Sequence, residues 1–226
     1  MTCDEALAAL SALADPDRAA QMQAYHKVDR PYLGLSNEVC NTLATDWRRS
    51  LTLADRLALA DALWQTNIFE ARITASKLLV QARIKPSDDQ AWHLILSWLP
   101  DLDSWALADA VAMAAQRRLL ADPSRLETVE TWTTSDHLWT KRAALVFSLP
   151  WTKQRHPKPE DLAARDRILG WAATYTEDPE WFIQKAIAWW LRDLSRKDPE
   201  RVRAFLSEHG EKMKAFAAKE AAKYLP

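Results

Sequence analysis

One tryptophan and one carboxylate stand four positions apart in the sequence, at Trp105 and Asp109. Residues at this spacing share a face of an α-helix, and Gln116 continues that face of a helix predicted over residues 104–120. A carboxylate held beside an aromatic wall could stabilise a cationic sugar during glycosidic cleavage and position a water molecule. The structural alternative is a tryptophan packed over a helix whose acidic residue is solvated. The spacing alone leaves both interpretations open.

A second aromatic stretch, residues 181–194, separates into two faces at about 100° per residue. The apolar face consists of Ile183, Ala186, Ile187, Trp190, Leu191 and Leu194. A nearly opposite stripe consists of Trp181, Lys185, Trp189 and Arg192. Trp190 is therefore predicted to be in the core. The stripe could rest against a neighbouring helix, or it could stack on bases or sugars beside phosphate contacts, where each aromatic contact contributes about 1–3 kcal/mol.

Arg142 occupies a position where a leucine is expected. Leu138, Arg142, Leu145 and Leu149 follow one another at 4-3-4 spacing on one helical face, after a predicted cap at Ser135 or Asp136. A guanidinium is rarely buried without a partner, so Arg142 must reach solvent, meet a carboxylate or bind an external anion such as phosphate. It belongs to a basic run without acidic residues between His137 and Pro159, which comprises Lys141, Arg142, Lys153, Arg155 and Lys158. This run is either a solvated face or a basic surface.

Composition restricts the fold and the chemistry. Only three glycines occur in 226 residues, too few for the tight turns of a sheet protein of this length. The two cysteines and five histidines have no metal-ligand spacing, and no phosphate-binding glycine loop is present, so we expect neither metal nor cofactor. The net charge of −1 argues weakly against nucleic acid as a partner. However, residues 181–226 carry ten basic and six acidic side chains.

The chain has no run of 18 apolar residues and no signal-peptide pattern at its start. We therefore expect a soluble, cytoplasmic protein without membrane contact.

A recurrent helix-start signal organises the chain. Aspartate followed by proline caps free N–H groups and starts a helix where proline costs no hydrogen bond. It occurs at Asp15, Asp122, Asp178 and Asp198. Caps and apolar periodicity together predict helices over 3–14, 16–28, 37–49, 53–66, 68–83, 87–98, 104–120, 123–134, 137–149, 159–174, 179–196, 199–208 and 211–223. Short connections between so many helices predict an all-α solenoid of antiparallel helix pairs with a concave face, as one domain over residues 1–226.

Five stretches, in order along the chain, resemble the AlkD-like family of DNA alkylation repair glycosylases. They are Tyr25-His26-Lys27 leading to Pro31-Tyr32-Leu33-Gly34-Leu35; Leu63-Trp64 with Glu70-Ala71-Arg72; Ser104-Trp105 with Asp109; Trp132 with Ser135-Asp136, Leu138-Trp139 and Arg142; and Phe182-Ile183-Gln184-Lys185-Ala186-Ile187 with Trp189. Together they span nearly the whole chain.

The resemblance implies a HEAT-like repeat protein that removes alkylated purines, such as 3-methyladenine and 7-methylguanine, from duplex DNA by hydrolysis of the N-glycosidic bond. It would be a monomeric hydrolase of base excision repair. The cationic base already leaves readily, so one carboxylate can suffice where ordinary glycosidases need two.

The resemblance also assigns roles to individual residues. Asp109 would stabilise the oxocarbenium-like sugar and orient water, with Trp105 and Trp189 against the deoxyribose and backbone. Arg142 would contact a phosphate, and Tyr25 would line the site. Lys141, Trp181, Lys185 and Arg192 are the further candidates for DNA contact. Two alternatives remain: a catalytically silent protein that binds unusual DNA structures, and a protein-interaction scaffold.

Overall fold

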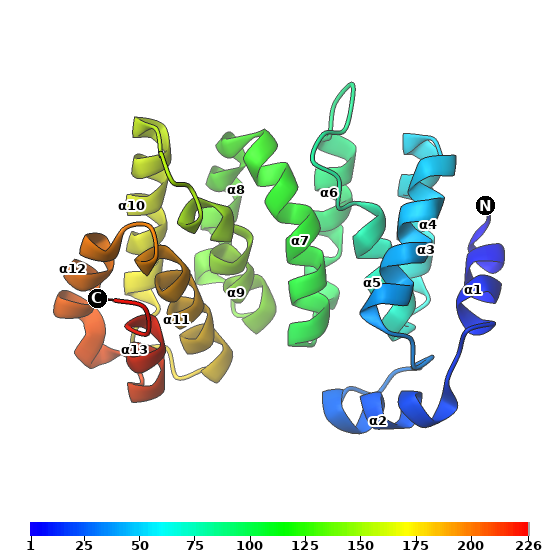
Figure 1. The fold of residues 1–226 in the computed structure, drawn as a ribbon, viewed down its shortest axis with the longest axis horizontal. Coiled ribbons are helices and arrows are strands. Elements are labelled where there is room, and N and C mark those ends of the chain that lie inside the picture. The colour runs from blue at the N-terminus through cyan, green and yellow to red at the C-terminus, as the bar shows by residue number, and fades with distance from the viewer. Residues whose placement is uncertain (226) are drawn as a thin grey trace. The chain divides into compact units, whose positions relative to one another are not determined.

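The computed structural model describes residues 1–225, which form thirteen α-helices, five short 3₁₀ segments and no strand (Figure 1). The all-helical prediction is confirmed. The helices fall into two compact units, Met1–Ala121 and Asp122–Pro226. A single domain over residues 1–226 stays a prediction.

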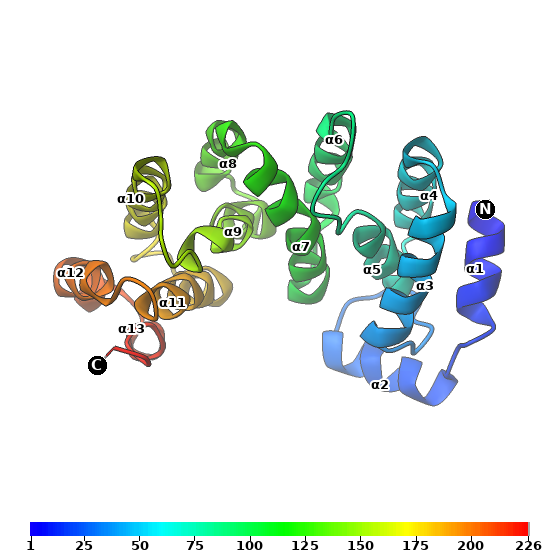
Figure 2. The same ribbon diagram turned by 45° about the horizontal axis from the view of Figure 1, so that its top comes forward.

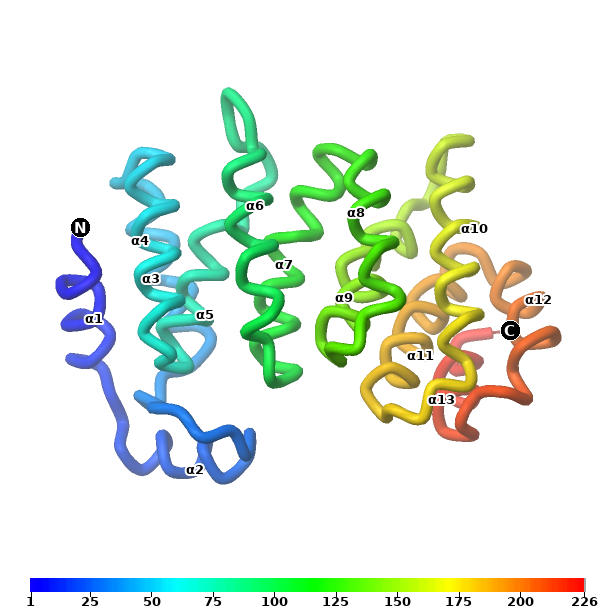
Figure 3. Tube along the Cα trace, turned by 180° about the vertical axis from the view of Figure 1, so that it is seen from behind, coloured from blue at the N-terminus to red at the C-terminus, as the bar shows by residue number. Residues whose placement is uncertain are grey.

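Unit 1 contains the first seven α-helices and one 3₁₀ segment, Leu99–Asp101. The helices are α1 (Cys3–Ser11), α2 (Pro16–His26), α3 (Asn37–Ser50), α4 (Leu53–Gln65), α5 (Phe69–Leu78), α6 (Asp89–Ser97) and α7 (Trp105–Ala121). Short links join α3, α4 and α5, so these helices pack with alternating direction. Helix α2 lies across the ends of its neighbours, as Figures 1 and 3 show.

Helix α5 forms the centre of unit 1 and packs against α3, α4 and α7. Every one of its residues except Lys77 is buried, including Glu70, Arg72, Thr74 and Ser76. The Thr74 and Ser76 hydroxyls donate to the carbonyls of Glu70 and Arg72 at 2.7 and 3.0 Å. Local hydrogen bonds therefore satisfy these hydroxyls, which would otherwise make burial costly.

Unit 2 contains the last six α-helices and four 3₁₀ segments. The helices are α8 (Leu126–Thr131), α9 (Leu138–Phe147), α10 (Pro159–Thr174), α11 (Trp181–Ser195), α12 (Pro199–His209) and α13 (Ala215–Ala221), and the 3₁₀ segments are Pro123–Arg125, Trp132–Thr134, Leu149–Thr152 and Gly210–Lys212. Helix α11 is the central element and packs against α9, α12 and α13 (Figure 2).

The predicted caps agree with the structure at most positions. The Asp15 and Asp198 carboxylates accept from backbone N–H groups in the first turns of α2 and α12, and Asp122 does so for a 3₁₀ turn. Asp178 instead accepts from the Glu180 N–H just before α11. No side chain caps α9, and the Ser135 hydroxyl accepts from the His137 N–H at 3.2 Å.

The largest deviation concerns the predicted helix over 123–134. It is divided into a 3₁₀ turn, the six-residue α8 and a second 3₁₀ turn. The predicted helices over 68–83 and 211–223 are shortened to Phe69–Leu78 and Ala215–Ala221. Within residues 1–225, no helix is long and apolar enough to span a bilayer.

Candidate functional site

A cavity of about 350 Å³ lies within unit 1, between α2, α3, α5 and α7. Its volume is within the range of small-ligand pockets. Its lining includes Tyr25, His26, Phe69, Glu70, Lys77, Trp105 and Asp109. We call it the aromatic cavity. It brings together the three unit 1 residues that the sequence selected, Tyr25, Trp105 and Asp109.

Four aromatic rings form the wall beside Asp109. The His26 ring lies 4.7 Å from Phe69 and 5.7 Å from Trp105, centroid to centroid. Tyr25 meets Trp105 edge-on at 6.3 Å. Trp105 begins α7 and Asp109 follows one turn later, so the helix presents both to the same space.

His26 is a neutral member of this wall near pH 7. Burial lowers the pKa of its imidazole, and the nearby Arg30 lowers it further, against an opposing effect of Glu70. Its Nδ1 atom is buried and has no hydrogen-bond partner among residues 1–225. The ring thus contributes apolar surface to the cavity rather than a fixed positive charge.

The second carboxylate of the cavity, Glu70, has a structural role. Its two oxygens accept from the backbone N–H groups of Leu33, Gly34 and Leu35 at 2.8, 2.8 and 3.1 Å. Three charge-assisted bonds in a buried environment fix the turn that follows α2. Glu70 is therefore committed to the backbone, and Asp109 is the other carboxylate that lines this cavity.

Gly34 allows this turn to approach α2. Its φ angle is +80°, and a Cβ atom there would overlap the Asp15 carbonyl oxygen and lie 2.8 Å from the Ala19 nitrogen. The Asp15 N–H also donates to the Leu33 carbonyl at 2.8 Å. Glu70 and Gly34 together position α2, and with it Tyr25 and His26.

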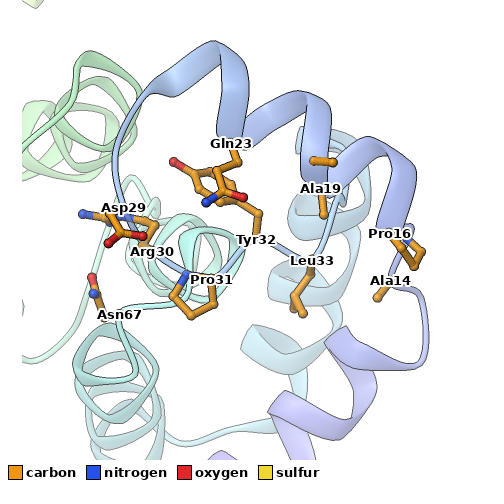
Figure 4. A pocket seen from close by; sticks show the side chains of 11 residues that line it. Ala14, Pro16, Ala19, Gln23, Asp29, Arg30, Pro31, Tyr32, Leu33 and Asn67 are labelled. Atoms are coloured by element: carbon orange, nitrogen blue, oxygen red, sulfur yellow. The ribbon is translucent and has the colours of Figure 1, made fainter.

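A larger cavity of about 710 Å³ lies beside the same turn, and Figure 4 shows its lining side chains. It is lined by Ala14, Pro16, Ala19, Ala20, Gln23, Asp29, Arg30, Pro31, Tyr32, Leu33 and Asn67. The Arg30 guanidinium forms an ion pair with Asp103. None of the predicted site residues lines this cavity, so its size does not make it the candidate site.

Burial separates the tryptophans of the chain. Nine of the twelve are buried: Trp47, Trp64, Trp92, Trp98, Trp132, Trp139, Trp151, Trp171 and Trp190. Trp105 and Trp181 are 38% and 48% exposed, and Trp189 is half-buried. These three are the tryptophans that the sequence analysis placed at the site. The core position predicted for Trp190 is confirmed.

The stripe of Trp181, Lys185, Trp189 and Arg192, here called the α11 stripe, lies on one side of α11 in unit 2 and contacts α13. Trp181 stacks on Phe216 with ring centroids 5.7 Å apart. Lys185 and Arg192 both pair with the Glu220 carboxylate, at 2.8 and 2.5 Å. Much of the α11 stripe therefore rests against a neighbouring helix, which was one of its two interpretations. Trp181 nevertheless keeps about half of its surface exposed.

Helix α9 holds the two remaining predicted cations. Arg142 is 4% exposed, and its guanidinium lies 5.7 Å from the centre of the Trp139 ring. The Lys141 ammonium pairs with Asp178 at 2.5 Å and lies 5.1 Å from the Tyr175 ring centre. Burial of Arg142 agrees with its place on the apolar stripe.

Sequence reasoning missed the roles of His26, Glu70 and Phe69. Glu70 belongs to one of the five stretches that resemble the family, but the N–H groups that donate to it lie 35 to 37 positions away along the chain, beyond any local pattern. His26 directly follows Tyr25, and its position at the end of α2 was the available signal. No group of three His, Cys, Asp or Glu side chains suited to a metal occurs within residues 1–225.

Both units are built from short packed helices, the architecture of helical-repeat proteins. A family model described as "DNA alkylation repair enzyme" matches residues 6–225. The chain therefore belongs to the DNA alkylation repair enzyme family.

Solved structures agree on the fold. A predicted DNA alkylation repair enzyme from Enterococcus faecalis is 22% identical, with a TM-score of 0.79 over 94% of this chain and 96% of the other. AlkD2 from Streptococcus mutans is 17% identical, with a TM-score of 0.63 over 92% of this chain and 98% of the other. At these identities the likeness concerns the fold alone. Among curated proteins, none matched the chain.

Proposed function

We propose that this protein is a DNA glycosylase that hydrolyses the N-glycosidic bond of cationic alkylated purines, such as 3-methyladenine and 7-methylguanine, in duplex DNA. The observation that carries the proposal is the presence of Asp109 in an aromatic cavity whose other carboxylate, Glu70, is held by three backbone N–H groups. Membership of the DNA alkylation repair family supports a DNA substrate. We expect it to act as a monomer in the cytoplasm.

The chemistry requires little proton transfer. In an alkylated purine, the C1′–N bond breaks and its electron pair neutralises the positive base, while positive charge develops on the deoxyribose. The Asp109 carboxylate stabilises that charge and orients the water that adds to C1′, and the proton that this water loses passes to solvent. Trp105 and Tyr25 provide an apolar surface beside the sugar, which strengthens the attraction between carboxylate and cation by excluding water.

Unit 2 supplies the contacts to the rest of the DNA in this proposal. Trp189 packs on the DNA backbone, and Arg142 contacts a phosphate. Trp181, Lys185, Arg192 and Lys141 are the further DNA-contacting residues of unit 2.

The direct test is release of free base from duplex DNA that carries 7-methylguanine, measured under single-turnover conditions. The proposal expects time-dependent release from methylated duplex and none from the matched unmodified duplex. Intact DNA after prolonged incubation with excess protein would contradict it.

A second candidate is a catalytically silent protein that binds unusual DNA structures. It is favoured by the pairing of Lys141, Lys185 and Arg192 with carboxylates of the same unit. These pairs leave fewer unpaired cations for the phosphates of a regular duplex. This candidate predicts salt-dependent binding to branched or distorted DNA without base release. Binding measured beside the release assay therefore separates the two.

A further inference from the structure

A third cavity of unit 1 has an excess of positive charge. It has a volume of about 500 Å³ and is lined by Arg48, Leu51, Arg56, Gln81, Arg83, Ile84 and Lys85. Four of these seven residues are cationic and none is acidic. We call it the basic pocket. It involves the C-terminal part of α3, the first turn of α4 and the loop between α5 and α6.

The basic pocket is separate from the aromatic cavity. The two share no lining residue. Figure 1 shows the α5–α6 loop at the end of unit 1 opposite α2, the helix that carries Tyr25 and His26. Any ligand of the basic pocket is therefore additional to whatever the aromatic cavity binds.

Two of the four cations are built into the wall by bonds to uncharged acceptors. Arg48 donates from Nη1 to the Val80 carbonyl at 2.6 Å and to the Lys77 carbonyl at 3.2 Å. Arg56, which is 6% exposed, donates from Nη1 to the Gln81 side-chain oxygen at 2.5 Å. These bonds fix the guanidinium groups in place without neutralising their charge.

Burial of the positively charged Arg56 side chain costs free energy. Burial lowers the pKa of its guanidinium, and repulsion from Arg48 lowers it further. Its Nε atom is buried without a hydrogen-bond partner among residues 1–225. A protein rarely keeps a buried guanidinium next to a second one without an anion to compensate.

The other two cations are available to a ligand. Arg83 and Lys85 are exposed, and neither side chain forms an ion pair or hydrogen bond within residues 1–225. Of the carboxylates next to the pocket in sequence, Asp55 accepts from the Thr52 hydroxyl at 2.7 Å, and Asp88 lies 3.3 Å from the Arg118 guanidinium. Two fixed guanidinium groups and two exposed cations around one concavity suit a tetrahedral oxyanion with several acceptor oxygens.

We propose that the basic pocket binds a phosphate group. The phosphate could be a phosphodiester of the DNA backbone or a free phosphate, and both present the same oxygens. The pocket itself does not depend on the proposed glycosylase activity; only the DNA source does.

The test compares the wild-type protein with Arg83→Gln/Lys85→Gln, which removes two exposed charges without touching the packed guanidinium groups. Lys197→Gln/Lys219→Gln is the matched control, because it removes two exposed lysines outside the pocket. Circular dichroism checks that all three proteins are folded.

In the first arm, inorganic phosphate is titrated at constant ionic strength and the Tm is recorded. We expect the Tm of the wild type and the control to rise by about 3–5 °C at a phosphate concentration ten times Kd. The pocket variant should lose most of that rise.

In the second arm, affinity for an unmodified duplex is measured against salt concentration. If the source is the DNA backbone, the slope of log K against log salt should become shallower by about 0.9 for each lost phosphate contact in the pocket variant, and remain unchanged in the control. A response in the first arm alone assigns the pocket to free phosphate.

Equal behaviour of the pocket variant, control and wild type in both arms would overturn the proposal, as would equal losses in the two variants. Base release from methylated DNA is scored separately. Its absence, with the phosphate response intact, would remove the glycosylase proposal and leave the pocket standing.

Discussion

The aromatic cavity of unit 1 and the α11 stripe of unit 2 contain similar residue types but differ in how their charges are used. In the cavity, Asp109 lies among rings, and the other carboxylate, Glu70, is bound to backbone N–H groups. In the stripe, Lys185 and Arg192 share Glu220. Tryptophans interleaved with charged residues can therefore belong to a packing contact or to a ligand site, and the partners of the charged groups distinguish the two. The comparison favours the cavity for chemistry and the stripe for weaker, adjustable contacts.

The largest expected effect concerns the support of the cavity. Gly34→Ala should lower the free energy of unfolding by about 2–4 kcal/mol, because the φ angle of +80° and the overlap with Asp15 are both unfavourable for alanine. Gly170→Ala is the matched control, since nothing lies within 4 Å of a Cβ there and the site is inside α10. It should stabilise by about 0.5–1 kcal/mol. Chemical denaturation measures both, and equal effects would show that Gly34 does not position α2.

Removal of one exposed tryptophan from each region tests the comparison itself. Trp105→Ala should reduce kcat/KM for base release by the equivalent of about 1–3 kcal/mol, or roughly 5- to 150-fold, because the ring stacks beside the reacting sugar. Trp181→Ala should weaken DNA binding with a smaller effect on the single-turnover rate. Both rings are more than one-third exposed, so both variants should fold. A larger loss of rate in Trp181→Ala would reverse the assignment.

The charge balance of the α11 stripe can be changed at one position. Glu220→Gln removes the carboxylate that Lys185 and Arg192 share, and should change stability by less than about 1 kcal/mol, since these groups are partly exposed. The released cations should make the salt dependence of DNA binding steeper by about 1–2 in the log–log slope. Glu127→Gln, an exposed position on α8, controls for the same change in net charge. An unchanged slope of log K against log salt would show that Lys185 and Arg192 serve helix packing and do not contact DNA.

The smallest expected effect is the pH dependence of the cavity wall. The folded-state pKa of His26 is lowered below its ordinary value, mainly by burial, so the unfolded chain binds this proton more readily than the folded one. His26 therefore contributes stability above about pH 6.5, and that contribution is lost as the pH falls through the lower folded pKa. His26→Gln should flatten the fall in stability below pH 6.5 relative to the wild type, in denaturation curves recorded between pH 7.5 and 5. Parallel curves for the two proteins would exclude this role.

The helices could be predicted from the sequence because caps and apolar periodicity are local features of the chain. Asp15 and Asp198 act within three residues, and the phase of residues 181–194 separates Trp190 from Trp189 without knowledge of any other helix. The division of the helix predicted over 123–134 was missed because 3₁₀ and α-helical turns share similar residue preferences.

The hydrogen-bond and ion-pair partners of the charged side chains could not be predicted, because these partners are distant in sequence. The pairs Lys141–Asp178 and Lys185–Glu220 span 37 and 35 positions, and Glu70 reaches back by a similar distance. Helical phase predicts which side chains leave the core but does not reveal which charge meets them. That gap explains why packing and DNA contact could not be separated for the α11 stripe from sequence.

The central claim is that Asp109 is the carboxylate that supports base release, and one substitution tests it directly. The rate of 7-methylguanine release from duplex DNA is measured with enzyme in excess for the wild type, Asp109→Asn and Asp46→Asn, an exposed carboxylate that pairs with Arg49 on α3. We expect Asp109→Asn to release base about 10²- to 10³-fold more slowly, with DNA affinity nearly unchanged and Asp46→Asn like the wild type. An undiminished rate in Asp109→Asn would contradict the account.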